Sequence, residues 1–184
     1  KMKIIDPETK AIKEDGEIGE ICVTGSMVMK GYLNQPEATN EALVRHADGE
    51  IWVETGDLGY RDPDGFYHFT SRIKRMIKVS GIPIYPIQIE NLIAEIPEVL
   101  QVAAIGIPHP YQMQVVKVFL RVKDGTDKPA LEERIVQLIG ERLLRYAIPK
   151  EIEYLDLFPQ TLIGKIDLKV LEEQERVKYE SSLK

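Results

Sequence analysis

Residues 72–86 read RIKRMIKVSGIPIYP, and the character of the sequence changes on the two sides of this stretch. Before it, short β-like segments alternate with turn signals. The strongest signal is Asp62-Pro63-Asp64-Gly65, because proline presets one turn dihedral and glycine tolerates the positive φ that follows. After the stretch, Pro86 opens an amphipathic helix that runs through Ile96, and Pro97 ends it. The sequence therefore predicts a β-rich region over residues 1–73 and an α+β domain over 74–184.

The expected elements differ between the two regions. Residues 1–73 should contain strands at 1–6, 18–24 and 51–54, with a short helix at 37–43. In the second region, Ile73–Val79 alternates like a strand that Gly81 and Pro83 end, while 99–107 and 115–122 are β-branched and apolar, as in central strands with two buried faces. Apolar residues at helical spacing over 129–145, a strand at 151–155 and a charged helix at 168–179 complete it. The predicted fold class is α+β, with a small central sheet flanked by helices.

Charge and cysteine content exclude several classes of function. The 184 residues include 24 basic and 30 acidic side chains, a net charge of −6, which disfavours nonspecific binding to nucleic acid or to an anionic membrane. The single Cys22 rules out an intramolecular disulfide and fits a small buried residue in a strand, and the three histidines show no metal-ligand spacing. We therefore expect no metal site in this chain. No apolar run approaches the roughly 20 residues of a membrane span, and no leader segment opens the chain, so we expect a cytoplasmic protein without a transmembrane segment.

Asp57 and Arg72 are candidates for binding a nucleotide sugar. Thr55-Gly56-Asp57 alone indicates a turn after a strand, but a carboxylate at a strand end can accept two hydrogen bonds from a vicinal diol. Arg72, fifteen residues later, offers a fork of donors suited to hydroxyl or phosphate oxygens. The alternative for Arg72 is a surface ion pair.

Two lysine-containing segments permit more than one interpretation. Arg72, Lys74, Arg75 and Lys78 could form a nucleic-acid patch, but a strand would place Arg75 on the opposite face, and a junction between domains explains the cluster better. Gly164-Lys165 is not a phosphate-binding P-loop, because that pattern requires Gly at the position of Pro159 and Ser or Thr at that of Ile166. In isolation, the pair indicates a turn with a solvated lysine.

Taken together, ordered motifs along the chain resemble the adenylate-forming superfamily of acyl-CoA ligases, peptide adenylation domains and luciferases. The motifs are Gly16-Glu17-Ile18-Gly19-Glu20-Ile21, Lys30-Gly31-Tyr32-Leu33-Asn34, Thr55-Gly56-Asp57-Leu58-Gly59, Asp64-Gly65-Phe66, Arg72-Ile73-Lys74 with Ile77-Lys78-Val79-Ser80-Gly81, Pro86 with Ile89-Glu90, and Gly164-Lys165-Ile166. The resemblance implies that residues 1–73 are the C-terminal part of a large domain and 74–184 a small mobile lid.

The resemblance also implies a two-step reaction. A carboxylate attacks the α-phosphate of Mg²⁺-bound ATP to form an acyl-adenylate and pyrophosphate, and the thiol of coenzyme A then displaces AMP. In this scheme Asp57 and Arg72 bind the ribose of ATP or AMP, and Lys74 is the hinge. Lys165 is catalytic, because it brings a mobile positive charge to the carboxylate and phosphate region. The ligands of Mg²⁺ lie mostly outside this chain.

The passage for coenzyme A would be lined by Lys78, Ser80 and Gly81, where glycine lets the backbone approach closely.

The sequence departs from the family pattern at several positions. Gln88 replaces a Glu, Met113-Gln114 replaces a Gly-Glu pair, and Asp167 and Leu168 replace basic residues. Before Gly164-Lys165, the family more often has Arg at the position of Gln160, a variable residue at that of Leu162 and Ser at that of Ile163.

The family's phosphate loop and most of its acyl pocket have no counterpart in this sequence. We therefore expect a fragment that is inactive alone and whose main partner is the missing N-terminal domain of the same protein. The surroundings of Ser80 and Pro86 favour a ligase for fatty acids. The alternatives are an amino-acid or aryl-acid adenylation domain, and a non-catalytic nucleotide-binding or regulatory module.

Overall fold

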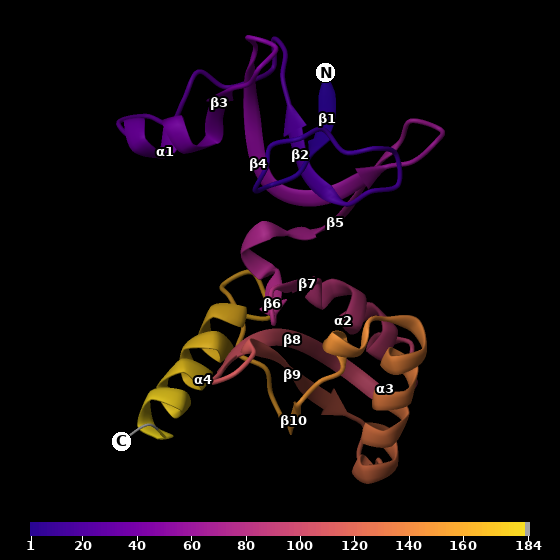
Figure 1. The fold of residues 1–184 in the computed structure, drawn as a ribbon. Coiled ribbons are helices and arrows are strands. Elements are labelled where there is room, and N and C mark those ends of the chain that lie inside the picture. Colours follow the sequence, from indigo (N-terminus) through magenta and orange to yellow (C-terminus); the bar gives the residue numbers. More distant parts are fainter. Residues whose placement is uncertain (183–184) are drawn as a thin grey trace. The chain divides into compact units, whose positions relative to one another are not determined.

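The computed structural model describes residues 1–182, and the chain divides into two compact units, Lys1–Lys74 and Arg75–Lys184 (Figure 1). The division falls inside a short 3-10 helix, η1, at Ile73–Arg75. Each unit has its own five-stranded sheet, and the helices that cover a sheet belong to the second unit. The predicted α+β class, with a small central sheet flanked by helices, is confirmed.

The first unit is an antiparallel sheet with strand order β1-β2-β4-β3, in which β5 also pairs with β4. Its core is small and consists of Ile5, Cys22 and Trp52, so Cys22 is the buried strand residue that the sequence predicted. The helix α1 contributes no buried residue. The elements are β1 Met2–Ile5, β2 Gly19–Val23, α1 Pro36–Ala42, β3 Leu43–Arg45, β4 Ile51–Arg61 and β5 Tyr67–Arg72.

Strand β4 continues through Thr55-Gly56-Asp57, although these residues were expected to form a turn after a shorter strand. That expectation was wrong because Asp57 pairs with Arg72 of β5 and two hydrogen bonds tie Thr55 and Gly56 to β2, which overrides the low strand propensity of Gly and Asp. The Thr55 hydroxyl donates to the Ile21 carbonyl at 2.7 Å, and the Gly56 N–H donates to Glu20 Oε1 at 2.9 Å. Thr55, Gly56 and Asp57 of β4 stand opposite the single residue Ile21 of β2, so β4 carries a bulge here.

The second unit has the strand order β10-β9-β6-β7, with β8 also paired to β9. Only β10 is parallel to its neighbour, because the helix α3 carries the chain from β9 to β10 as a crossover. The elements are β6 Ile77–Val79, β7 Ile82–Ile84, α2 Pro86–Ala94, β8 Val99–His109, β9 Met113–Val122, α3 Lys128–Arg142, a 3-10 helix η2 at Arg145–Ala147, β10 Glu151–Tyr154 and α4 Leu168–Ser182.

The expected single strand over Ile73–Val79 is wrong in its first half, which is the 3-10 helix η1. Two successive basic residues, Lys74 and Arg75, interrupt the alternation of apolar and polar residues there. Arg75 forms an ion pair with Glu90 of α2, with Arg75 Nη2 2.6 Å from Glu90 Oε1. Only Ile77–Val79 keeps the period of two, and it joins the sheet.

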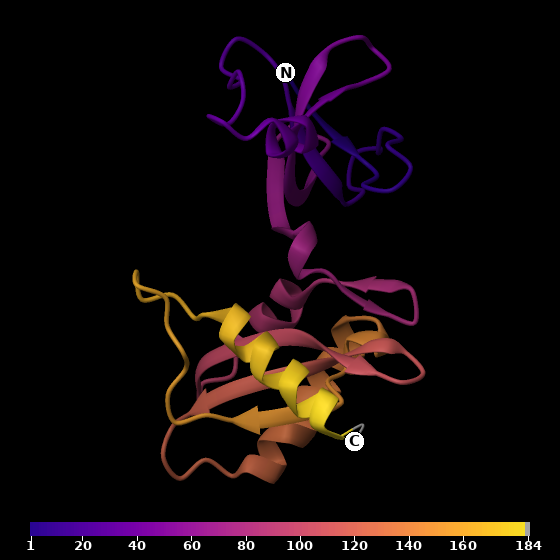
Figure 2. The ribbon, with the colours of Figure 1, turned by 90° about the vertical axis from the view of Figure 1, so that its left-hand side faces the viewer.

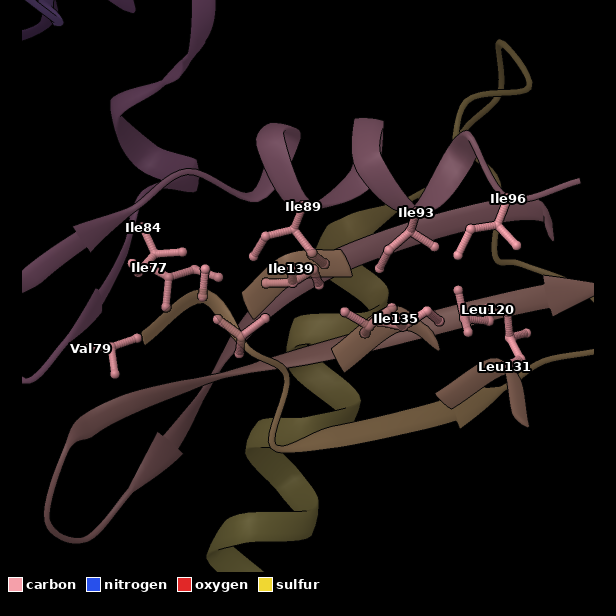
Figure 3. Packing of buried hydrophobic residues seen from close by; sticks show 14 residues of the cluster. Ile77, Val79, Ile84, Ile89, Ile93, Ile96, Leu120, Leu131, Ile135 and Ile139 are labelled. Carbon is pink, nitrogen blue, oxygen red and sulfur yellow. The ribbon is translucent and has the colours of Figure 1, made fainter. Parts of the chain in front are cut away.

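Strands β8 and β9 are buried on both faces, as their apolar sequence predicted. On one face they pack with α2 and α3 around a first core that includes Ile89, Ile135 and Leu120 (Figure 3). On the other face they pack against α4 around a second core that includes Phe119, Phe158 and Leu171. Figure 2 shows α4 lying across its face of the sheet. Because α4 covers the face opposite α2 and α3, the second unit has three layers.

Candidate functional site

Asp57 and Arg72 are neighbours on adjacent strands of the first unit. The antiparallel register of β4 and β5 places them opposite each other, and Arg72 Nε lies 3.0 Å from Asp57 Oδ1. The Arg72 side chain is 65% exposed and that of Asp57 is 27% exposed, so the pair lies at the surface of the unit. The structure thus brings together two residues that are fifteen positions apart in the sequence. They form a surface ion pair, which was the alternative role expected for Arg72.

The carboxylate of Asp57 keeps unused hydrogen-bonding capacity. Its backbone N–H donates to Thr55 Oγ1 at 3.1 Å, and this fixes the residue in the strand. Among the described residues, none donates a hydrogen bond of good geometry to the buried Oδ1, and Arg72 Nε reaches it as an ion pair at 3.0 Å. A carboxylate oxygen has more than one lone pair, so an oxygen held in an ion pair can still accept a hydrogen bond from a ligand hydroxyl.

A hollow of about 410 Å³ lies beside the same strand but does not include Asp57 or Arg72. Three carboxylates, Glu20, Glu41 and Glu54, and the candidate hinge Lys74 line it. Burial raises the pKa of the Glu20 carboxyl, although the hydrogen bond from Gly56 acts in the opposite direction. An acidic lining disfavours a triphosphate, so this hollow is not where the phosphates of ATP would bind.

Ser80 and Gly81 form the two-residue turn of the β6–β7 hairpin. Val79 pairs with Ile82, and the two turn residues have φ values of 52° and 82°, as a type I′ turn requires. Pro83 fits β7 because this strand is at the edge of the sheet and needs no further donor. A Cβ placed on Gly81 would meet no atom within 4 Å, so bare backbone is exposed at the hairpin tip.

Lys165 lies in a tight hydrogen-bonded loop between β10 and α4. Gln160 and Ile166 form an antiparallel bridge, and the Thr161 N–H donates to the Lys165 carbonyl at 2.8 Å. Gly164 closes the turn with a φ of 76°. The Lys165 side chain is exposed, and within residues 1–182 no hydrogen bond or ion pair holds its ammonium group. The loop therefore presents a free positive charge on a defined backbone.

The basic residues near the unit boundary do not share one strand face. Arg72 is in β5, Lys74 and Arg75 are in η1, and Lys78 is in β6. Arg72 pairs with Asp57, and Arg75 pairs with Glu90, which also accepts the Ala104 N–H of β8 at 2.9 Å. Two of the four charges are thus committed to carboxylates, which argues against the nucleic-acid interpretation.

Sequence reasoning missed a buried charged cluster in the second unit. Lys117, in the middle of β9, is surrounded by Glu151, Glu153 and Glu175. The surrounding run of apolar residues concealed it, and no local spacing connects it to its partners. Within residues 1–182, no group of three or more His, Cys, Asp or Glu could hold a metal ion, and no helix has the length and apolar character needed to cross a membrane.

Comparisons with known proteins give one family for the second unit and ligases as relatives of the chain. Residues 88–165 match the family described as the AMP-binding enzyme C-terminal domain. A long-chain-fatty-acid–CoA ligase of Escherichia coli O157:H7 is 36% identical over 180 residues, which are 97% of this chain and 30% of that protein. The medium/long-chain-fatty-acid–CoA ligase FadD8 of Mycobacterium tuberculosis is 35% identical over 176 residues, 93% of this chain and 30% of that protein.

The crystal structure of ATP-bound MatB from Rhodopseudomonas palustris matches with a TM-score of 0.82 at 31% identity, over 95% of this chain and 33% of that one. Residues 88–165 therefore match the C-terminal domain of AMP-binding enzymes, and the resemblance of the chain to acyl-CoA ligases is confirmed. It spans about 30% of the length of the ligases named above.

Proposed function

We propose that this chain is the C-terminal part of an ATP-dependent acyl-CoA ligase, and that Lys165 is its catalytic lysine. The observation that carries the proposal is the free ammonium group of Lys165 on a closed, hydrogen-bonded loop. A positioned cation is most effective where negative charge accumulates in a transition state, as it does when a carboxylate attacks the α-phosphate of ATP. The fatty-acid ligases among the relatives support this reaction class.

In the proposal, Asp57 and Arg72 bind the ribose of ATP and of the acyl-adenylate. The Asp57 carboxylate supports this role, because its oxygens can accept hydrogen bonds from the two hydroxyls of a ribose. The Arg72 guanidinium, already held near that carboxylate, would donate to the same diol. Mg²⁺ would arrive with the triphosphate, with most of its ligands outside this chain.

The second step would use the tip of the β6–β7 hairpin. Coenzyme A would pass along the exposed backbone of Ser80 and Gly81, with Lys78 at the base of the hairpin. Because Lys165 and Gly81 would act in different steps, we propose that the small domain reorients between them, with Lys74 as the hinge, and that residues 1–73 and 74–184 are parts of two different domains.

The acid is proposed to be a fatty acid, since ligases for long and medium chains are among the relatives. A longer protein, with an N-terminal domain that supplies the phosphate loop and acyl pocket, would be the partner that completes the site. The cytoplasmic location expected from composition stays a prediction.

The test is ATP–pyrophosphate exchange with acetate, octanoate, palmitate, benzoate and an amino-acid mixture. We expect no exchange with the 184-residue chain, because a ribose site alone leaves the triphosphate unsupported. The longer protein should catalyse exchange with a fatty acid and then form its CoA thioester. Exchange only with amino acids or benzoate would favour an adenylation domain for those acids, and no exchange with any acid would favour a non-catalytic module.

A further inference from the structure

The buried ammonium group of Lys117 is the centre of an ion cluster that joins three elements. Its side chain is only 5% exposed, and Nζ lies 2.8 Å from Glu153 Oε2 and 3.2 Å from Glu151 Oε2 of β10. The third partner is Glu175 of α4, whose side chain is 7% exposed and whose Oε2 lies 2.8 Å from Nζ. One cation thus connects β9, β10 and α4.

The charges in the cluster depend on one another. Burial alone would lower the pKa of Lys117, but hydrogen bonds to Glu153, Glu175 and Glu151 outweigh it and raise this pKa, so the ammonium form is strongly favoured. Lys178 provides a second positive charge 2.6 Å from Glu175 Oε1. Removing Lys117 would leave three carboxylates with one cation, and the buried Glu175 would lose its buried partner and keep the exposed Lys178.

The two elements that Lys117 contacts from β9, namely β10 and α4, flank the Lys165 loop. Strand β10 ends at Tyr154, and α4 begins at Leu168. Between them, Phe158 packs in the second core on one side of the loop and Ile166 packs against it on the other. The Asp167 N–H also donates to the Pro159 carbonyl at 2.8 Å, which closes the base of the loop.

We propose that Lys117 is a positioning residue for Lys165: its ammonium group ties the strand before the loop to the helix after it, so that the loop presents Lys165 from a fixed base. The inference rests on the proposed function of Lys165 but makes a structural claim of its own. Lys117 touches no reacting group; it acts through the placement of the loop. A displacement of about 1 Å at a reacting group can lower a rate by about two orders of magnitude.

The first experiment is amide hydrogen exchange on the 184-residue chain. In Lys117→Met, which keeps an apolar stem and removes the charge, we expect faster exchange in the 155–167 loop and in α4, with the first core unchanged. Arg176→Met is the matched control, because Arg176 forms ion pairs with Glu173 and Glu180 along α4 through exposed side chains. It should exchange like the wild type. Unchanged loop exchange in Lys117→Met would overturn the proposal, whether or not the longer protein is a ligase.

The second experiment separates positioning from stability in the longer protein. Lys117→Met/Glu175→Gln removes the buried cation together with a buried carboxylate, so the melting temperature should recover most of what Lys117→Met loses. Adenylation kcat should nevertheless stay about 10-fold or more below wild type with the KM for ATP unchanged, and thioester formation from supplied acyl-adenylate should be spared.

If adenylation recovers together with the melting temperature, or if both half-reactions fall equally, Lys117 is only a structural residue and the proposal is wrong. A wild-type protein that adenylates no acid would refute the proposed function instead, while the hydrogen-exchange result would still decide the structural claim.

Discussion

Met113, at the start of β9, has a left-handed backbone conformation with a φ of 64°. For a residue with a Cβ this conformation costs about 1–2 kcal/mol, and its side chain is 65% exposed, so little packing offsets the strain. We expect Met113→Gly to stabilise the second unit by about 0.5–1 kcal/mol, since the greater freedom of glycine in the unfolded chain cancels part of the gain.

Urea denaturation of the two variants Met113→Gly and Met113→Ala would measure this effect. Alanine keeps the Cβ and hence the strain, so it is the control and should give no gain. Equal unfolding midpoints for the two variants would show that the conformation of Met113 is not strained.

At the scale of single residues, the sequence predicted side chains whose motifs are local and missed those defined by packing. Asp57, Arg72 and Lys165 stand in short recognisable motifs, and the structure places each at a surface. Lys117 has no motif, because its partner Glu175 is 58 residues away and is brought near only by the packing of α4. Gln114, also in β9, departs from the family pattern in the sequence. It accepts a hydrogen bond from the Lys78 N–H at 3.0 Å, which the sequence could not predict because the two residues are 36 positions apart.

Among the elements, the β6–β7 hairpin allows the proposed second step to be tested. In the longer protein, Gly81→Leu should slow thioester formation by about 10-fold or more, because removing bare backbone where a substrate must pass disrupts its placement. Pyrophosphate exchange should be largely intact. Gly81→Ala is the matched control for strain, since its Cβ also stands at a φ of 82° but adds little bulk.

We expect the alanine variant to lose stability like the leucine variant but to keep most of the thioester rate. Equal rates in the two variants, measured with supplied acyl-adenylate and coenzyme A, would contradict a coenzyme A passage at this turn.

The elements themselves were predictable where the apolar residues form a continuous run or a helical repeat. Strands β8 and β9 and helices α2, α3 and α4 follow their apolar patterns. The predictions failed at β4 and η1. Strand β4 continues through Gly56 because a hydrogen bond to Glu20 of β2 holds it there. At η1, a short alternating run does not show that Arg75 forms an ion pair with Glu90. Both failures are cases in which tertiary pairing overrides local preference.

For the whole molecule, the resemblance to adenylate-forming enzymes predicted the family, and the change in sequence character at residues 72–86 predicted a β-rich region followed by an α+β region. It did not determine how the units work together, because each has its own sheet and core. The central claim is that Lys165 supplies the charge for adenylation alone. In the longer protein, Lys165→Ala should lower the adenylation rate by about 100-fold or more.

The most direct measurement is the rate of both half-reactions for wild type, Lys165→Ala and Lys169→Ala. Lys169 is an exposed lysine in the first turn of α4 and serves as the control for loss of one positive charge. Adenylation should fall only in Lys165→Ala, while thioester formation from supplied acyl-adenylate stays near wild type in all three. If Lys165→Ala slows the two half-reactions equally, or slows neither, Lys165 is a surface lysine on a turn and the account is wrong.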